Sequence, residues 1–142
     1  MKLQEILSAK GSKVHSIPAD ATLQDAVQEL TRNRVGSLVV RDHAHRLAGI
    51  ITERDILHAS VAGSRPLSEV KVAEAMSTEL ITGSVDDDVE DVMGLMTTRR
   101  IRHLPIVSQG NLVGIISIGD VVKAQHDRLA LENQCLKDYI TG

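Results

Sequence analysis

The sequence predicts an α/β fold in which a β-α-β-β-α motif occurs twice and is followed by a C-terminal helical extension. The first observation is an internal repeat, because a shift of 66 residues places residues 14–40 on residues 80–106. After one residue is dropped in a loop, a shift of 65 places residues 47–56 on residues 112–121. The second is that each copy has apolar residues at helical spacing, followed by two short β-branched runs. Because neither copy buries its apolar face alone, we expect the two to form one module.

Each copy is expected to begin with an extended segment and a helix. The extended segments are Val14–Ile17 and Leu80–Gly83. Asp20 and Thr22 can cap the helix of the first copy. Asp86–Asp88 place negative charge at the start of the second helix, which is predicted over residues 86–98. Both helices have apolar residues at i, i+3, i+4 and i+7: Leu23, Ala26, Val27 and Leu30, and then Val89, Val92, Met93 and Met96.

Two strands and a second helix complete each copy. In the first copy, Ser37–Arg41 and Leu47–Thr52 flank a polar loop. In the second, Leu104–Val107 and Leu112–Ile116 flank residues 108–111, whose Gly and Asn are typical of a hairpin turn. The paired isoleucines of the last strand in each copy indicate a strand that is covered on both faces. A helix is expected directly after each of these strands.

The repeat and the Gly-Ser-Arg-Pro stretch at residues 63–66 define the expected domain boundaries. The first motif spans residues 1–62, the linker 63–70, the second motif 71–125 and the helical extension 126–142.

The second copy ends in a helical pattern that the first copy lacks. It runs from Ile118 to about Ile140 and carries Leu129, Leu136 and Tyr139 on one side. This apolar stripe either meets a partner helix or folds back on its own domain.

Composition excludes several classes of function. The chain has 142 residues, a net charge of −3, no Trp, no Phe and one Tyr, so it lacks the aromatic platforms of single-stranded nucleic-acid binding and the basic surface of duplex binding. A single cysteine, Cys135, rules out an intrachain disulfide and a four-Cys zinc site, and we interpret it as a small apolar residue of the C-terminal helix. The N-terminus lacks the pattern of a signal peptide, and no apolar run reaches the length of a membrane span. We expect a cytoplasmic protein.

A short Ser/Thr-x-x-Asp motif occurs at the same place in both copies, as Thr52–Asp55 and Ser117–Asp120. Taken alone, each would most often be a capping box at a helix start. Both, however, directly follow a Gly-Ile-Ile strand, at the carboxyl end where α/β proteins bind ligands. A carboxylate at such a position suits the hydroxyl groups of a ribose, as in dinucleotide sites.

The duplicated segments Gly49–Ile56 and Gly114–Val121, together with Ile101–Val107, resemble the cystathionine-β-synthase (CBS) domain pair. The resemblance covers nearly the whole chain and implies two motifs packed with pseudo-twofold symmetry. It also implies a regulatory module that binds an adenosine-containing ligand in clefts between the motifs and commonly dimerises. Candidate ligands are AMP, ADP, ATP, NAD(H) and S-adenosylmethionine. A pair without an attached enzyme or transporter is similar to stand-alone bacterial CBS proteins.

The resemblance implies roles for individual residues at this site. Asp55 and Asp120 would bind ribose, and Thr52 and Ser117 a ribose hydroxyl or a phosphate oxygen. The full expected nucleotide-binding set is Val14, Ile17, Ser37, Thr52, Arg54, Asp55, Ile81, Arg102, His103, Pro105, Ser117, Gly119 and Asp120.

Phosphate and adenine need different partners. Arg102 and His103 lie past the preceding helix, where the family often has phosphate contacts, whereas the first copy has Gly36 and Ser37 there. The two sites are therefore expected to differ, and the first must rely on Arg54, Lys13 or a neighbouring element. Adenine would contact aliphatic side chains, although plain core packing is at least as good an interpretation of each: Val14, Ile17, Ile81 and Pro105.

Neither a metal site nor an enzyme is expected. His43 and His45 could chelate a metal, but no Asp, Glu or Cys has suitable spacing, and a polar loop explains them. No nucleophile has an ordered base beside it. Two hypotheses therefore stand: a ligand-sensing module acting on an unknown effector protein, or a ligand-independent dimerisation scaffold whose C-terminal helix contacts a partner.

Overall fold

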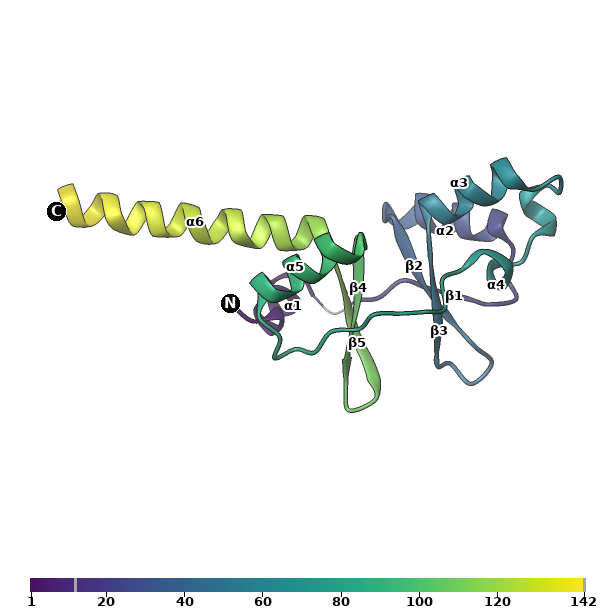
Figure 1. Ribbon diagram of the computed structural model, residues 1–142, viewed down its shortest axis with the longest axis horizontal. Coiled ribbons are helices and arrows are strands. Elements are labelled where there is room, and N and C mark those ends of the chain that lie inside the picture. The colour runs from purple at the N-terminus through teal and green to yellow at the C-terminus, as the bar shows by residue number, and fades with distance from the viewer. Residues whose placement is uncertain (12, 142) are drawn as a thin grey trace. The chain divides into compact units, whose positions relative to one another are not determined.

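The computed structural model describes residues 1–11 and 13–141, and it has the α/β architecture and the long C-terminal helix that the sequence predicts. The chain divides into two compact units. We call residues 13–81 the first unit, and residues 1–11 together with 82–141 the second unit. Figure 1 labels the elements of both.

The first unit is a three-stranded sheet with helices packed on it. The strand order is β1-β2-β3, with β1 parallel to β2 and β2 antiparallel to β3. Its apolar core joins all three strands to the helices, and Thr22 caps the first of these as predicted. The elements are β1 (Ser16–Pro18), α2 (Leu23–Asn33), β2 (Ser37–Arg41), β3 (Leu47–Thr52), α3 (Glu53–Ala62), a 3-10 turn (Leu67–Glu69) and α4 (Val72–Ala75).

The second unit repeats this plan around the antiparallel hairpin of β4 and β5. The predicted turn between these strands is present, and both Gln109 and Gly110 have positive φ there. The elements are α1 (Leu3–Lys10), α5 (Val89–Arg99), β4 (His103–Ser108), β5 (Asn111–Ser117) and α6 (Ile118–Thr141).

The structure corrects two sequence predictions for the second copy. The segment predicted to be extended at 80–83 forms only a single bridge, between Gly83 and Ile106. The helix predicted over 86–98 begins only at Val89. Ser84 and Asp87 close a turn between these points, because the Asp87 carboxylate accepts from the Ser84 N–H at 2.8 Å. The first copy has a turn at the aligned position, where the Ala21 N–H donates to the Pro18 carbonyl oxygen, and α2 begins at Leu23, which aligns with Val89. Both helices therefore begin after the same turn.

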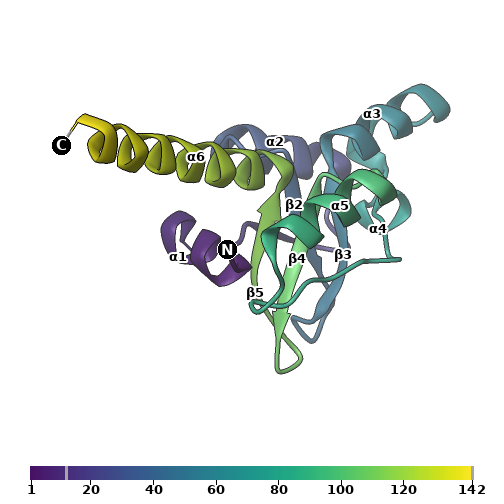
Figure 2. The ribbon, with the colours of Figure 1, turned by 60° about the vertical axis from the view of Figure 1, so that its left-hand side comes forward.

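Each unit contains a helix that the repeat assigns to the other copy. Helix α1 precedes the first copy in sequence but lies in the second unit, where Leu3 is fully buried and the helix contacts β5 and α6 (Figure 2). Conversely, Val72 of α4 is a fully buried core residue of the first unit. The division by contacts thus differs from the division by repeats into residues 1–62 and 71–125. The positions of α1 and α4 in their units correspond. Lys2, directly before α1, forms a backbone bridge to Asp88 at the start of α5, and Lys71, directly before α4, forms one to Thr22 at the start of α2.

A glycine in the last strand of each unit lies against a segment that the repeat assigns to the other copy. We call these segments, α1 in the second unit and α4 with the residues after it in the first unit, the exchanged segments. A Cβ on Gly114 of β5 would lie 2.6 Å from Cδ2 of Leu7 in α1. A Cβ on Gly49 of β3 would lie 2.6 Å from the carbonyl oxygen of Ser77 and 2.9 Å from Sδ of Met76, directly after α4. Both strands therefore need glycine because of close approach.

We predict that Gly49→Ala destabilises the protein by about 1–3 kcal/mol, the usual cost of overpacking. Gly114→Ala should cost less, because the end of the Leu7 side chain can rotate, whereas the Ser77 carbonyl is backbone and accepts a hydrogen bond from the Ile50 N–H at 3.0 Å. Urea unfolding midpoints measure the difference.

Gly94→Ala in α5 is the matched control, because a Cβ there meets nothing within 4 Å. It should leave stability unchanged or raise it slightly. Equal destabilisation by the Gly49 and Gly94 substitutions would contradict the close-approach explanation.

Candidate functional site

The first turn, Thr52–Asp55, connects β3 to α3. Thr52 is the N-cap of α3, and its hydroxyl oxygen accepts from the Asp55 N–H at 3.2 Å. In return, Oδ2 of Asp55 accepts from the Thr52 N–H at 2.9 Å and from the Thr52 hydroxyl at 3.0 Å. Among the described residues no donor reaches Oδ1 of Asp55. The turn is thus a capping box that leaves one carboxylate oxygen uncommitted.

The second turn, Ser117–Asp120, connects β5 to α6 with the same backbone geometry. Oδ2 of Asp120 accepts from the Ser117 N–H at 2.8 Å, and the Asp120 N–H donates to Oγ of Ser117 at 3.1 Å. Unlike the Thr52 hydroxyl, the Ser117 hydroxyl donates no hydrogen bond to any described residue. The hydroxyl can therefore donate to a ligand while it caps the helix.

Lys10, from the exchanged helix α1, distinguishes the second turn from the first. Its Nζ lies 2.6 Å from Oδ2 of Asp120 and 2.7 Å from the carbonyl oxygen of Ile115. Burial alone would raise the pKa of Asp120, but the hydrogen bonds and charge of Lys10, together with the Ser117 N–H, hold that pKa below its ordinary value. Asp120 is therefore a charged, partly buried carboxylate.

The strand opposite each turn carries the other predicted polar residues. Ser37 pairs with Thr52 in the first unit, and His103 pairs with Ser117 in the second. Both are half-buried, whereas Arg54, Arg102 and Gly119 are exposed. The carbonyl oxygen of Arg102, directly before β4, accepts a hydrogen bond from the N–H of Ile118, the first residue of α6. The fold thus brings the predicted polar residues of each copy to its own turn.

The predicted adenine contacts differ in burial. Ile17 is 4% exposed and belongs to the core of the first unit, and Pro105 is buried in β4. Val14 and Ile81 are half-buried. Ile81 begins the second copy by sequence, yet it lies in the first unit by contacts.

Lys10 is the residue that sequence reasoning missed. The available signal was a second repeat, because residues 2–8 (Lys-Leu-Gln-Glu-Ile-Leu-Ser) match residues 71–77 (Lys-Val-Ala-Glu-Ala-Met-Ser) at a shift of 69. This shift identifies α1 and α4 as one duplicated element. It does not reveal that α1 packs in the second unit, and therefore does not place Lys10 beside Asp120.

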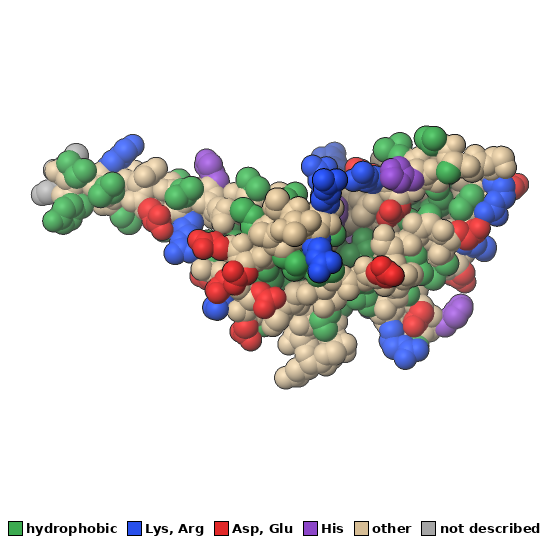
Figure 3. Space-filling view, viewed as in Figure 1, with side chains coloured by type: hydrophobic (Ala, Val, Ile, Leu, Met, Phe, Trp, Pro, Cys, Tyr) green, Lys and Arg blue, Asp and Glu red, His purple; other side chains and the backbone are tan. Residues whose placement is uncertain are grey.

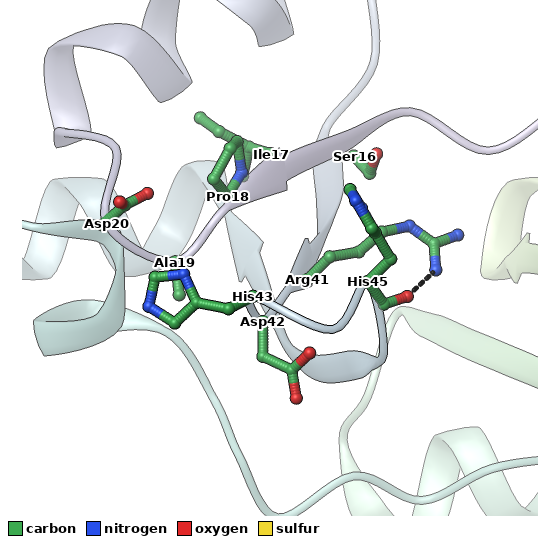
Figure 4. A pocket seen from close by; sticks show the side chains of 9 residues that line it. All are labelled: Ser16, Ile17, Pro18, Ala19, Asp20, Arg41, Asp42, His43 and His45. Atoms are coloured by element: carbon green, nitrogen blue, oxygen red, sulfur yellow. Dashed lines mark hydrogen bonds between the residues drawn. The ribbon is translucent and has the colours of Figure 1, made fainter.

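A separate hollow of about 400 Å³ lies at the other end of the first unit's sheet (Figure 4). It is formed by β1 and the β2–β3 loop, and Figure 4 shows the Arg41 guanidinium bonded to the His45 carbonyl oxygen at 2.9 Å. In the pairing of β2 with β3, Arg41 pairs with Leu47 at the end that forms the hollow, whereas Ser37 pairs with Thr52 at the opposite end. The hollow is therefore distinct from the first turn. It is lined by Ser16, Ile17, Pro18, Ala19, Asp20, Arg41, Asp42, His43 and His45.

Within residues 1–11 and 13–141, no group of three or more His, Cys, Asp or Glu side chains is placed to hold a metal ion. None of the described helices combines the length and apolar character that crossing a membrane requires.

Comparison with known proteins identifies the family. The CBS domain family matches residues 6–62 and again residues 72–127. The chain belongs to the CBS domain family. It is 37% identical to the mitochondrial CBS domain-containing protein CBSX3 of Arabidopsis thaliana, over 99% of this chain and 72% of that protein. It is also 37% identical to the CBS domain-containing protein YhcV of Bacillus subtilis, over 80% of each chain.

Solved structures show the same fold. A CBS-domain protein from Agrobacterium tumefaciens has a TM-score of 0.84 at 33% identity and covers 87% of this chain and 92% of its own. A hexameric CBS-CP12 protein from bloom-forming cyanobacteria has a TM-score of 0.75 at 30% identity, over 86% of this chain and 69% of its own. These matches establish a CBS pair. Since the relatives include a plant protein, they support no bacterial origin in particular.

We predict that the ion pair between Lys10 and Asp120 contributes to stability in a pH-dependent way. Because the pKa of Asp120 is lowered on folding, its contribution is complete above the ordinary carboxyl value of 3.8 and is lost as the pH falls through the lower folded value. Urea unfolding of wild type and Asp120→Asn from pH 7 to pH 3 measures this. The difference in stability between the two proteins should be constant above pH 3.8 and should shrink as the pH falls below it, and a difference that does not shrink would contradict the assignment.

Proposed function

We propose that this CBS pair is a regulatory module that binds adenosine-containing nucleotides, such as AMP, ADP, ATP or NAD(H), at the Ser/Thr-x-x-Asp turns that follow β3 and β5. The observation that carries the proposal is the duplicated turn, in which one carboxylate oxygen is held by the turn itself and the other is uncommitted. A carboxylate held in this way is oriented before the ligand arrives, which lowers the entropy cost of binding a ribose diol. S-adenosylmethionine offers the same adenosine and is a further candidate.

Regulation requires that the ligand favour one arrangement of the protein over another. We propose that binding changes how the motifs or the subunits are arranged and that an effector protein reads this change. The match is to a domain family that is generally regulatory, and we propose a binding module without catalytic activity. The cytoplasmic location stays a prediction from the sequence, and the Arabidopsis relative carries a mitochondrial name.

A second candidate function, a self-associating scaffold, is favoured by helix α6. Every described side chain from His126 to Ile140 is exposed, so the helix does not fold back on its own unit. Val122, Leu129 and Leu136 are spaced by seven residues and are 55%, 60% and 58% exposed. Figure 3 shows apolar side chains along this helix. Residues that recur every seven positions on an exposed helix are typical of a helix–helix seam.

We predict that Asp55→Asn and Asp120→Asn each weaken nucleotide binding by about 10–100-fold at the altered turn, the usual effect of removing a charged hydrogen-bond partner. Isothermal calorimetry with AMP, ATP, NADH and S-adenosylmethionine measures binding. Because the chain has no Trp and one Tyr, a co-purified nucleotide would also dominate its absorbance near 260 nm.

Asp25→Asn is the matched control for lost helix capping. Thr22 and Asp25 form the same capping box at the start of α2, with hydrogen bonds of 3.0 and 3.1 Å, away from both turns. It should lower stability without changing affinity. Unchanged binding in the double variant Asp55→Asn/Asp120→Asn would refute the proposed site.

For the scaffold, we predict that Leu129→Glu/Leu136→Glu weakens self-association at least about tenfold, because each buried leucine contributes roughly 1.5–3 kcal/mol. Sedimentation velocity over a concentration series measures this. Leu57→Glu/Val61→Glu on α3 is the control, since these side chains are 65% and 88% exposed outside α6. If both double variants weaken self-association equally, a specific helix–helix interface on α6 is excluded.

A further inference from the structure

The two turns differ in charge although their backbones match. Oδ2 of Asp55 is held only by groups of Thr52, and the structure records no ion pair between Asp55 and any described lysine or arginine. Oδ2 of Asp120 is held by the Ser117 N–H and by the Lys10 ammonium at 2.6 Å. Each of these oxygens has two donors, but only the second turn is neutralised by a cation. The first turn therefore keeps a net negative charge.

Lys10 has binding capacity left. An ammonium group carries three N–H donors, and two of them are used by Asp120 and the Ile115 carbonyl. No described residue accepts from the third. The Lys10 side chain is 33% exposed, so this donor can reach a ligand in solution. Its position is maintained by the two existing bonds and by the buried residues of α1, Leu3 and Leu7 among them.

The groups around the second turn suit a phosphorylated ligand. Lys10 and the Ser117 hydroxyl offer donors, while Oδ1 of Asp120 offers an acceptor. A ribose hydroxyl needs the acceptor, and a phosphate needs donors and a positive charge. At the first turn a phosphate would meet an unneutralised carboxylate, and like charges at short range repel.

The repeat register agrees with this difference. At the shift of 69 that aligns α1 with α4, Lys10 falls on Glu79, a residue of the first unit. The first unit therefore has an acid in the sequence position where the second has its lysine, and the segment that follows α4 supplies no equivalent cation.

We propose that Lys10 determines the charge class of ligand, so that the second turn selects adenosine ligands that carry a phosphate. The first turn, in contrast, prefers a neutral or cationic adenosyl group. This inference rests on the proposed nucleotide binding and adds a residue from outside the repeated turn motif. It assigns to the exchanged helix a role in ligand choice as well as in packing.

The test compares adenosine with AMP, which differ only by the phosphate. Calorimetry in the Asp55→Asn background isolates the second turn, and there AMP should bind at least about tenfold more tightly than adenosine. Adding Lys10→Met should abolish this preference, because it removes the ammonium group that would bind the phosphate as well as its bonds to Asp120 and the Ile115 carbonyl. Adenosine should still bind, since it has no phosphate for Lys10 to contact. In the Asp120→Asn background, AMP should bind no more tightly than adenosine.

Lys2→Met is the matched control. Lys2 is the N-cap residue of the same helix and pairs with Asp88 at 2.9 Å, and none of its hydrogen bonds or ion pairs reaches Thr52–Asp55 or Ser117–Asp120. It should leave the AMP preference intact. Circular dichroism checks folding, and if Lys10→Met is unfolded, Lys10→Gln and a salt series on the Asp55→Asn protein replace it. Added salt should weaken AMP binding and spare adenosine.

The outcomes separate this inference from the proposed function. If AMP binding depends on Asp120 but Lys10→Met leaves the AMP preference unchanged or tightens AMP binding, the role of Lys10 is refuted and nucleotide binding stands. AMP affinity that is independent of salt refutes it as well. If the wild-type protein binds neither adenosine nor AMP, both proposals fall.

Discussion

The packing of an exchanged helical segment against a strand glycine is the contact on which the rest of the structure depends. In the second unit α1 lies over Gly114, and in the first the chain after α4 lies over Gly49. Each contact covers the last strand of its unit, the strand that leads directly into the Ser/Thr-x-x-Asp turn. A side chain at either glycine would occupy space that the segment fills. The same contact therefore completes the core and sets the surroundings of the candidate site.

Exchange of these segments also makes two similar turns chemically different. The backbone hydrogen bonds of Thr52–Asp55 and Ser117–Asp120 agree closely, because both are capping boxes after a Gly-Ile-Ile strand. Helix α1, however, extends to Lys10 and delivers an ammonium group to Asp120. Helix α4 ends at Ala75, well before the aligned Glu79. A duplicated scaffold can thus hold two sites of different charge, with the difference carried by a neighbouring element.

Much of the fold was predictable from local patterns. Strands Ser37–Arg41 and Leu47–Thr52 have their predicted limits, and the long helix starts at Ile118 as expected, because alternating and helical apolar periods are properties of nearby residues. The segment at 80–83 keeps only the bridge between Gly83 and Ile106, which is the counterpart of the Ile17–Val40 pair in the first unit. The repeat therefore predicted the partner strand correctly, but the parallel pairing is shorter in the second copy.

The sequence by itself determined the CBS motif, its duplication, the two turns and their polar neighbours Ser37 and His103. These follow from periodicity and from strand register, which act over a few residues. Only the tertiary structure decided which unit α1 and α4 belong to, and hence that Lys10 neutralises Asp120. That contact joins residues 110 positions apart. It depends on which apolar surfaces pack together between segments far apart in the chain, and the spacing of residues within a motif does not predict that packing.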